Sequence, residues 1–64
     1  MSRYRVYCGP TIVEQVARKL STAKVTVQCV GTAHVYVDTE KTADELLDVL
    51  GRQGFNGRDI YQFH

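Results

Sequence analysis

Hydrophobic and polar residues alternate in two runs within residues 24–38, and Gly31 and Thr32 separate the two runs. A period of two places every second side chain on the same face of a β-strand, so each run predicts a strand with one apolar face. Two such strands around a two-residue turn predict a β-hairpin. Because only one face is apolar, we expect that face to be covered and the other to be open. The predicted inner positions are Val25, Val27, Cys29, Ala33, Val35 and Val37.

The segment before the hairpin has the pattern of a strand followed by a helix. Residues 3–8 alternate and predict a first strand, which ends at Gly9 and Pro10. Thr11 and Glu14 have the spacing of a capping box, so we expect a helix with Thr11 as its N-cap. Apolar residues then recur at i, i+3, i+4 and i+7, as on an amphipathic helix. The predicted inner positions are Tyr4, Val6 and Cys8 on the strand and Val13, Val16, Ala17 and Leu20 on the helix.

A second helix is predicted after the hairpin. Thr42 and Glu45 form another expected capping box. Gly54 is the predicted left-handed residue beyond the end of this helix, and Phe55 is expected to fold back on it as in a Schellman motif. The apolar stripe of the second helix consists of Ala43, Leu46, Leu47 and Leu50.

Residues 58–63 are β-branched and aromatic enough to predict a last strand, after a turn at Asn56 and Gly57. Two facings of this strand are open. Either Ile60 points inward and Tyr61 and Phe63 border the open face, or the facing is reversed. We favour the first alternative.

The predicted elements follow the order β-α-β-β-α-β within a single domain of residues 1–64. Right-handed crossovers place both helices on one face of a four-stranded antiparallel sheet with strand order 4-1-3-2, which is a ferredoxin-like α+β fold. In this order another strand separates the strands of Cys8 and Cys29. Their backbones then lie roughly 9 to 10 Å apart, beyond the ~7 Å that a disulfide spans. We therefore expect two free thiols.

The charge balance and the lengths of the apolar runs narrow the possible functions. Eight Lys and Arg residues against seven Asp and Glu residues give a formal net charge of +1, which lacks the electrostatic signature of nucleic-acid or membrane binding. No apolar run has the length of a signal peptide or a membrane span. The sequence therefore predicts a cytoplasmic protein without a membrane partner.

The stretch YVDTEKTADELLDVLGRQGF at residues 36–55 resembles the third strand and second helix of heavy-metal-associated domains, and residues 13–20 resemble their first helix. The resemblance implies the same fold. The C-x-x-C motif that carries metal in that family is absent, since the corresponding loop contains Cys8 alone. One thiol cannot form the two-coordinate soft-metal site, so we predict no metal and no cofactor.

The loop Cys8-Gly9-Pro10-Thr11 also resembles the C-G-P-C redox loop of thioredoxins, with Thr11 in place of the second cysteine. One interpretation is a reactive thiol, because a helix N-terminus lowers the pKa of a nearby cysteine. The other is a small apolar residue at the inner end of a strand. We favour the second interpretation because there is no resolving cysteine.

Aromatic and arginine side chains are expected on the open face of the two central strands, where Asp38 adds a negative charge. These residue types dominate protein–protein hot spots, and they also stack bases in RNA-recognition motifs. The glycine- and aromatic-rich octapeptide of those motifs is absent. A solvated polar face without a ligand is the third alternative. The candidate binding residues are Arg3, Arg5, Tyr7, His34 and Tyr36.

No catalytic constellation is present in the sequence. Ser2 and Ser21 have no neighbouring base, and His34 is the one internal histidine. We therefore predict a non-enzymatic module that contacts another protein, including a second copy in a homodimer, through the open face or an edge strand. Binding of single-stranded nucleic acid to the same face is the alternative.

Overall fold

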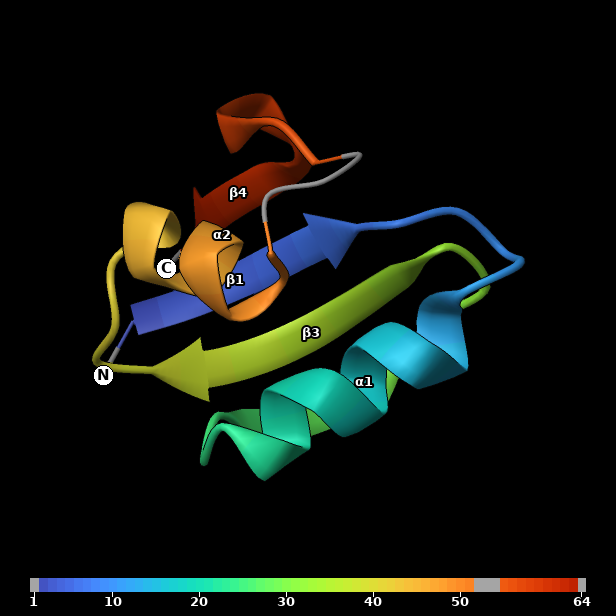
Figure 1. The fold of residues 1–64 in the computed structure, drawn as a ribbon, viewed down its shortest axis with the longest axis horizontal. Coiled ribbons are helices and arrows are strands. Elements are labelled where there is room, and N and C mark those ends of the chain that lie inside the picture. The colour runs from blue at the N-terminus through green and yellow to red at the C-terminus, as the bar shows by residue number, and fades with distance from the viewer. Residues whose placement is uncertain (1, 52–54, 64) are drawn as a thin grey trace.

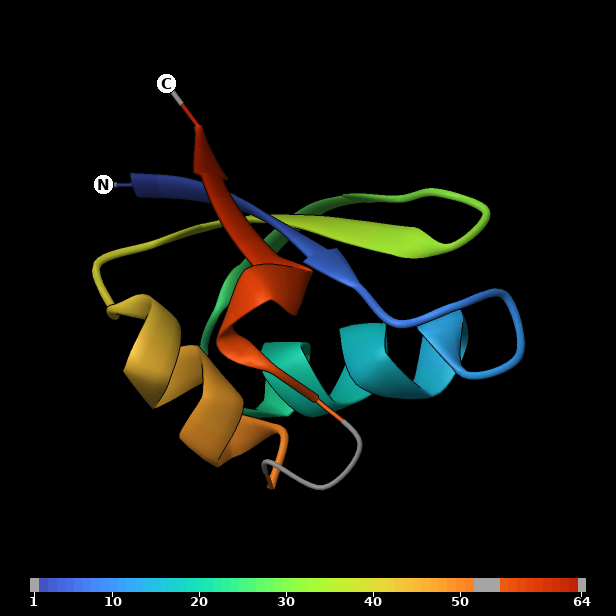
Figure 2. The same ribbon diagram turned by 90° about the horizontal axis from the view of Figure 1, so that it is seen from above.

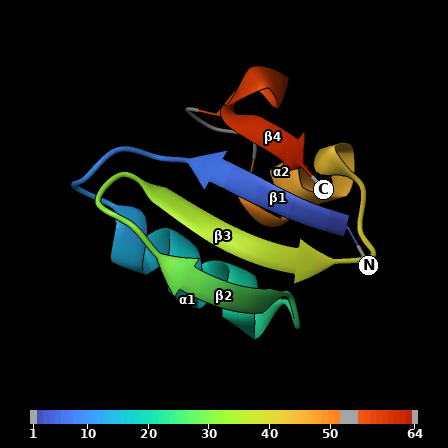
Figure 3. The ribbon, with the colours of Figure 1, turned by 180° about the vertical axis from the view of Figure 1, so that it is seen from behind.

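The computed structural model describes residues 2–51 and 55–63. Its four strands form one antiparallel sheet of order β2-β3-β1-β4, which is the order 4-1-3-2 read from the other edge (Figure 3). The predicted α+β class and strand order are therefore confirmed. The elements are β1 (Ser2–Tyr7), α1 (Val13–Thr22), β2 (Thr26–Val30), β3 (His34–Thr39), α2 (Ala43–Val49), the 3₁₀ turn η1 (Gly57–Asp59) and β4 (Ile60–Phe63).

Both helices lie on the same side of the sheet. Figure 1 shows them in front of the strands, and the view from above in Figure 2 shows them together below the sheet. α1 packs against β2 and β3, and α2 approaches β4. Within the described ranges, the other side of the sheet carries no helix, and we call the side chains there the open face.

The core fills the space between the sheet and the helices. Val6, Val35 and Val37 of the two central strands are fully buried, as the period of two predicts. Ile60 is buried and Tyr61 is 50% exposed, so the favoured facing of the last strand is confirmed. The other buried apolar residues are Tyr4, Val16, Leu20, Val25, Leu46, Leu47 and Leu50.

β2 does not keep the predicted alternation. Val27 lies opposite Val37, but Cys29 lies opposite Tyr36, so Gln28 is an extra residue without its own partner. One extra residue in a strand exchanges the two faces beyond it. The prediction that Cys29 points inward is therefore wrong, and Cys29 is exposed on the open face.

The hairpin turn lies one residue later than predicted. The Gly31 N–H donates to the His34 carbonyl at 2.7 Å, which leaves Thr32 and Ala33 as the turn. Ala33 is therefore not an inner residue of β3. Its carbonyl instead accepts hydrogen bonds from the N–H groups of Cys8 and Gly9.

The predicted capping box at the start of α1 is wrong. Ile12 is the N-cap, and no side chain caps this end. Gly9 has a φ of +83°, and the turn that it begins continues through Thr11. The helix therefore starts later than predicted, and the third position after the cap is Gln15 rather than Glu14.

The capping box of α2 is confirmed. The Thr42 hydroxyl accepts from the Glu45 N–H at 3.2 Å, and the Glu45 carboxylate accepts from the Thr42 N–H at 2.9 Å. The hydrogen bond from the Thr42 N–H to the carboxylate, with a smaller effect of the Thr42 side chain, lowers the pKa of Glu45. The helix ends earlier than predicted, because Gly51 with a φ of +81° is the left-handed residue beyond it. Gly54 lies outside the described residues.

α1 ends in a Schellman motif that the sequence did not predict. The Val25 N–H donates to the Leu20 carbonyl at 3.0 Å, and the Lys24 N–H donates to the Ser21 carbonyl at 3.1 Å. Leu20 and Val25 are both buried, which is the apolar contact that accompanies this motif. Lys24 has a φ of 66° and occupies the position that usually holds glycine.

We predict that Lys24→Gly stabilises the protein. A side chain in the left-handed region costs about 1 kcal/mol or more, and glycine avoids this at a smaller cost in unfolded-state entropy. The free energy of unfolding should rise by about 0.5 to 1 kcal/mol in urea titrations. Lys24→Ala is the matched control and should give no such gain, because alanine keeps the Cβ atom. Equal gains from both substitutions would assign the effect to the lysine side chain instead.

Candidate interaction surface on the open sheet face

The antiparallel register of β1 and β3 brings the five sequence-predicted residues together. Arg5 lies opposite Tyr36 and Tyr7 opposite His34, while Arg3 lies opposite Asp38. All these positions alternate with buried residues, so their side chains belong to the open face. The open face therefore contains the whole candidate set on two adjacent strands.

Aromatic rings form a continuous row across this face. The ring of His34 lies 5.2 Å from that of Tyr7 in an edge-on arrangement and 6.4 Å from that of Tyr36. Tyr36 meets Phe63 of β4 edge-on at 6.3 Å, and Phe63 lies 6.3 Å from Tyr61. We call these five rings the aromatic row. Edge-on pairs at such separations are favourable ring geometries, so the row is a pre-formed surface across β3, β1 and β4.

The accessible parts of the aromatic row lie at its two ends. Tyr7 is 49% exposed and Tyr61 is 50% exposed, whereas the rings between them are half-buried by their neighbours. Phe63 connects the two halves because it extends from an edge strand toward Tyr36. The sequence placed Phe63 only at the border of the face, since no local pattern shows which rings meet across β1.

Arg3 is paired within the protein. Its Nε lies 2.9 Å from Oδ1 of Asp38, and its Nη2 lies 3.4 Å from Oδ2. The Gln28 side chain donates to the same Oδ2 at 2.7 Å. Hydrogen bonding and the charge of Arg3, with a smaller effect of Gln28, lower the pKa of Asp38 despite partial desolvation. The pair neutralises one corner of the open face.

Arg5 has a different environment. Its guanidinium carbon lies 5.2 Å from the centre of the Tyr61 ring, within the range of a cation–π contact. In the part of the chain that the structure describes, no carboxylate pairs with Arg5. Arg3 is thus neutralised by Asp38, whereas Arg5 has no carboxylate partner among the described residues. The sequence alone does not show this difference.

Cys8 does not have the surroundings of a reactive thiol. It is partly buried, and its Sγ lies 3.7 Å from the Ala33 carbonyl oxygen. Burial raises the pKa of Cys8. α1 begins only at Val13, so the helix N-terminus does not follow the cysteine directly. The structure therefore favours the interpretation of Cys8 as a packing residue.

We predict that the two thiols differ in alkylation rate. Cys29 should react with iodoacetamide at the rate of an exposed thiol, and Cys8 should react at least about tenfold more slowly because burial reduces both its access and its thiolate fraction. Mass spectrometry of Cys8→Ser and Cys29→Ser variants separates the two rates. Denatured, unreduced protein should titrate two thiols. A fast rate at Cys8 would restore the interpretation as a reactive thiol.

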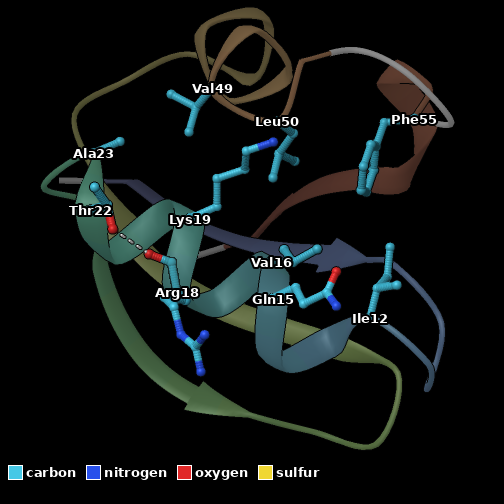
Figure 4. A pocket seen from close by; sticks show the side chains of 10 residues that line it. All are labelled: Ile12, Gln15, Val16, Arg18, Lys19, Thr22, Ala23, Val49, Leu50 and Phe55. Atoms are coloured by element: carbon cyan, nitrogen blue, oxygen red, sulfur yellow. Dashed lines mark hydrogen bonds between the residues drawn. The ribbon is translucent and has the colours of Figure 1, made fainter.

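A groove of about 700 Å³ lies on the opposite side of the molecule, between α1 and α2 (Figure 4). Figure 4 shows the Lys19 side chain extending toward α2 and the Arg18 side chain pointing away from it. Among the described residues, the groove lining contains no carboxylate, histidine or cysteine. Its lining residues are Ile12, Gln15, Val16, Arg18, Lys19, Thr22, Ala23, Val49, Leu50 and Phe55.

Within residues 2–51 and 55–63, no three His, Cys, Asp or Glu side chains gather closely enough to hold a metal ion. Neither α1 nor α2 is long and apolar enough to cross a bilayer. No protein-family model matches the chain, and no curated protein or solved structure is significantly similar to it. The open face carries the row of rings and the two unlike arginines.

Proposed function

We propose that this protein is a non-enzymatic binding module of ferredoxin-like topology that contacts another protein through the open face. The observation that carries the proposal is the aromatic row, which crosses three strands and is half exposed at both ends. Exposed tyrosines beside an arginine are the residue types that contribute most to protein–protein affinity. Rings that already support one another lose little conformational freedom on binding.

Single-stranded nucleic acid is the second candidate for the same face. Rings on the central strands with an adjacent arginine favour it, because bases stack on such platforms. Against it, Arg3 is paired with Asp38, so its charge is not available to a phosphate. A nucleic-acid complex would weaken steeply with salt, and a protein complex held by aromatic contacts would weaken much less. Titration of fluorescent oligouridylate at low and moderate salt distinguishes the two.

The setting that we propose is the cytoplasm. Cys8 and Cys29 are both free, as expected in a reducing compartment. The partner is either a different protein or a second copy of this chain, and an edge strand could extend the contact. Light scattering of the purified protein separates these cases, because only self-association doubles the mass.

The test of the proposal is the double substitution of Tyr7 and Tyr36 by alanine. Both side chains lie on the open face, so the free energy of unfolding should fall by no more than about 1 to 2 kcal/mol. Affinity capture from cells that contain the natural partner should lose that partner. The matched control replaces Gln15 and Arg18 of α1 by alanine and should keep it. Equal capture by both variants would contradict the proposal, and so would unfolding of the tyrosine variant.

A further inference from the structure

We propose that the open face binds a protein segment that presents an Asp or Glu carboxylate to Arg5. This inference rests on the proposed function and specifies the chemistry of the partner. It follows from the charges on the open face, from the position of Arg5 in the sheet and from the contact of its guanidinium with Tyr61.

The charged groups of the open face do not cancel. Its strand positions include Arg3, Arg5 and Asp38. Arg3 and Asp38 form an ion pair, and Gln28 donates a further hydrogen bond to the same carboxylate. Arg5 remains without a carboxylate in the described part of the chain. Among the described residues, the strand positions of the face therefore present one uncompensated positive charge, that of Arg5.

Arg5 lies near the centre of the surface rather than at its rim. It is in the middle of β1, a central strand, and it lies opposite Tyr36 of β3 on one side and Tyr61 of β4 on the other. A partner that covers the aromatic row must therefore cover Arg5 and remove water from it. Covering an unpaired charge is costly unless the partner supplies the opposite charge.

The guanidinium carbon of Arg5 lies over the Tyr61 ring, 5.2 Å from its centre. A cation–π contact does not use the N–H groups of a guanidinium as hydrogen-bond donors to a carboxylate, so a partner carboxylate can still accept two parallel hydrogen bonds from them. A partner carboxylate at this position would be flanked by the rings of Tyr36 and Tyr61. Apolar or aromatic side chains next to that carboxylate in the partner would then contact the rest of the aromatic row.

The same position of Arg5 disfavours the other two occupants. A two-fold pair of identical chains centred on this face would bring two copies of Arg5 toward each other, and like charges at the centre of an interface repel. A nucleic-acid strand would present several phosphates to a face on which, among the described residues, Arg5 is the one uncompensated cation, because Arg3 is paired with Asp38. A segment with one carboxylate among apolar residues matches the charge of the face.

The experiment selects from a phage-displayed library of random dodecapeptides in parallel against the full chain, Arg5→Gln and Arg18→Gln. Arg18→Gln removes the same charge from α1, on the opposite side of the sheet. We expect the full chain and Arg18→Gln to enrich peptides that contain Asp or Glu beside apolar residues. The selected peptides, synthesised and titrated by fluorescence, should bind Arg5→Gln at least about tenfold more weakly and Arg18→Gln within about twofold.

Enriched peptides without Asp or Glu would overturn the inference. If the binding of such peptides still required Tyr7 and Tyr36, the proposed function would be supported although the inference about Arg5 is wrong. Equal weakening by the two arginine substitutions would also overturn it, because the effect would then come from net charge. A selection that enriches no peptide on the full chain would overturn the inference, whereas capture that depends on the two tyrosines would still support the proposed function.

Discussion

Replacement of Leu46 by alanine is expected to lower the free energy of unfolding by about 3 kcal/mol. Leu46 is completely buried and belongs to the stripe through which α2 packs on the sheet. Removing its branched end gives up the transfer energy of three carbon atoms and leaves a cavity. A domain of 64 residues has a total stability of only about 3 to 10 kcal/mol, so this loss is a large part of it. Urea unfolding followed by circular dichroism measures the change.

Asp44→Ala is the matched control on the same helix. Asp44 is exposed in the first turn of α2, and the small loss in its interaction with the helix dipole is offset by the higher helix propensity of alanine. The free energy of unfolding should therefore change by less than about 0.5 kcal/mol. A loss below about 1 kcal/mol for Leu46→Ala would mean that α2 does not pack on the sheet as described.

The elements that the sequence predicted correctly are those in which several signals agree. Alternation in β1 and β3 and the capping box of Thr42 and Glu45 each combine periodicity with a boundary residue. The apolar stripes of α1 and α2, Val16–Leu20 and Leu46–Leu50, both cover the same apolar face of the sheet, because β1 and β3 bury side chains on the same side. The strand order follows from these elements and the handedness of their connections.

The predictions that are wrong concern places where one residue changes the local geometry and the amino-acid composition does not indicate the change. The bulge at Gln28 turns Cys29 to the open face, although the alternation of Val25, Val27 and Cys29 is regular in the sequence. The turn after Gly9 moves the start of α1, so that Thr11 no longer caps it. A bulge and a longer turn each arise from tertiary pairing, which a single strand or helix pattern does not contain.

Prediction of the candidate surface from the sequence is limited in the same way. The alternation of β1 and β3 was sufficient to place Arg3, Arg5 and Tyr7 on one face. It could not show that Arg3 is neutralised by Asp38 while Arg5 lies over Tyr61, because both facts depend on the register between strands that are far apart in the chain. The distinction between the two arginines, on which the proposed chemistry of the partner rests, is therefore a property of the folded sheet.

The second large effect is expected from Ile60→Ala, and it tests the facing of β4. Ile60 is 6% exposed and packs in the core, so alanine should lower the free energy of unfolding by about 2 to 3 kcal/mol through loss of packing in the sheet edge. Its neighbour Tyr61 is 50% exposed on the other face, and Tyr61→Ala should cost no more than about 1 kcal/mol although it removes more atoms. The two variants differ by one position in the chain, so the contrast between their urea midpoints depends on the facing of the strand.

If Tyr61→Ala were the more destabilising variant, β4 would have the reverse facing. The aromatic row would then lose one of its two exposed ends, and Arg5 would lose its contact with the Tyr61 ring.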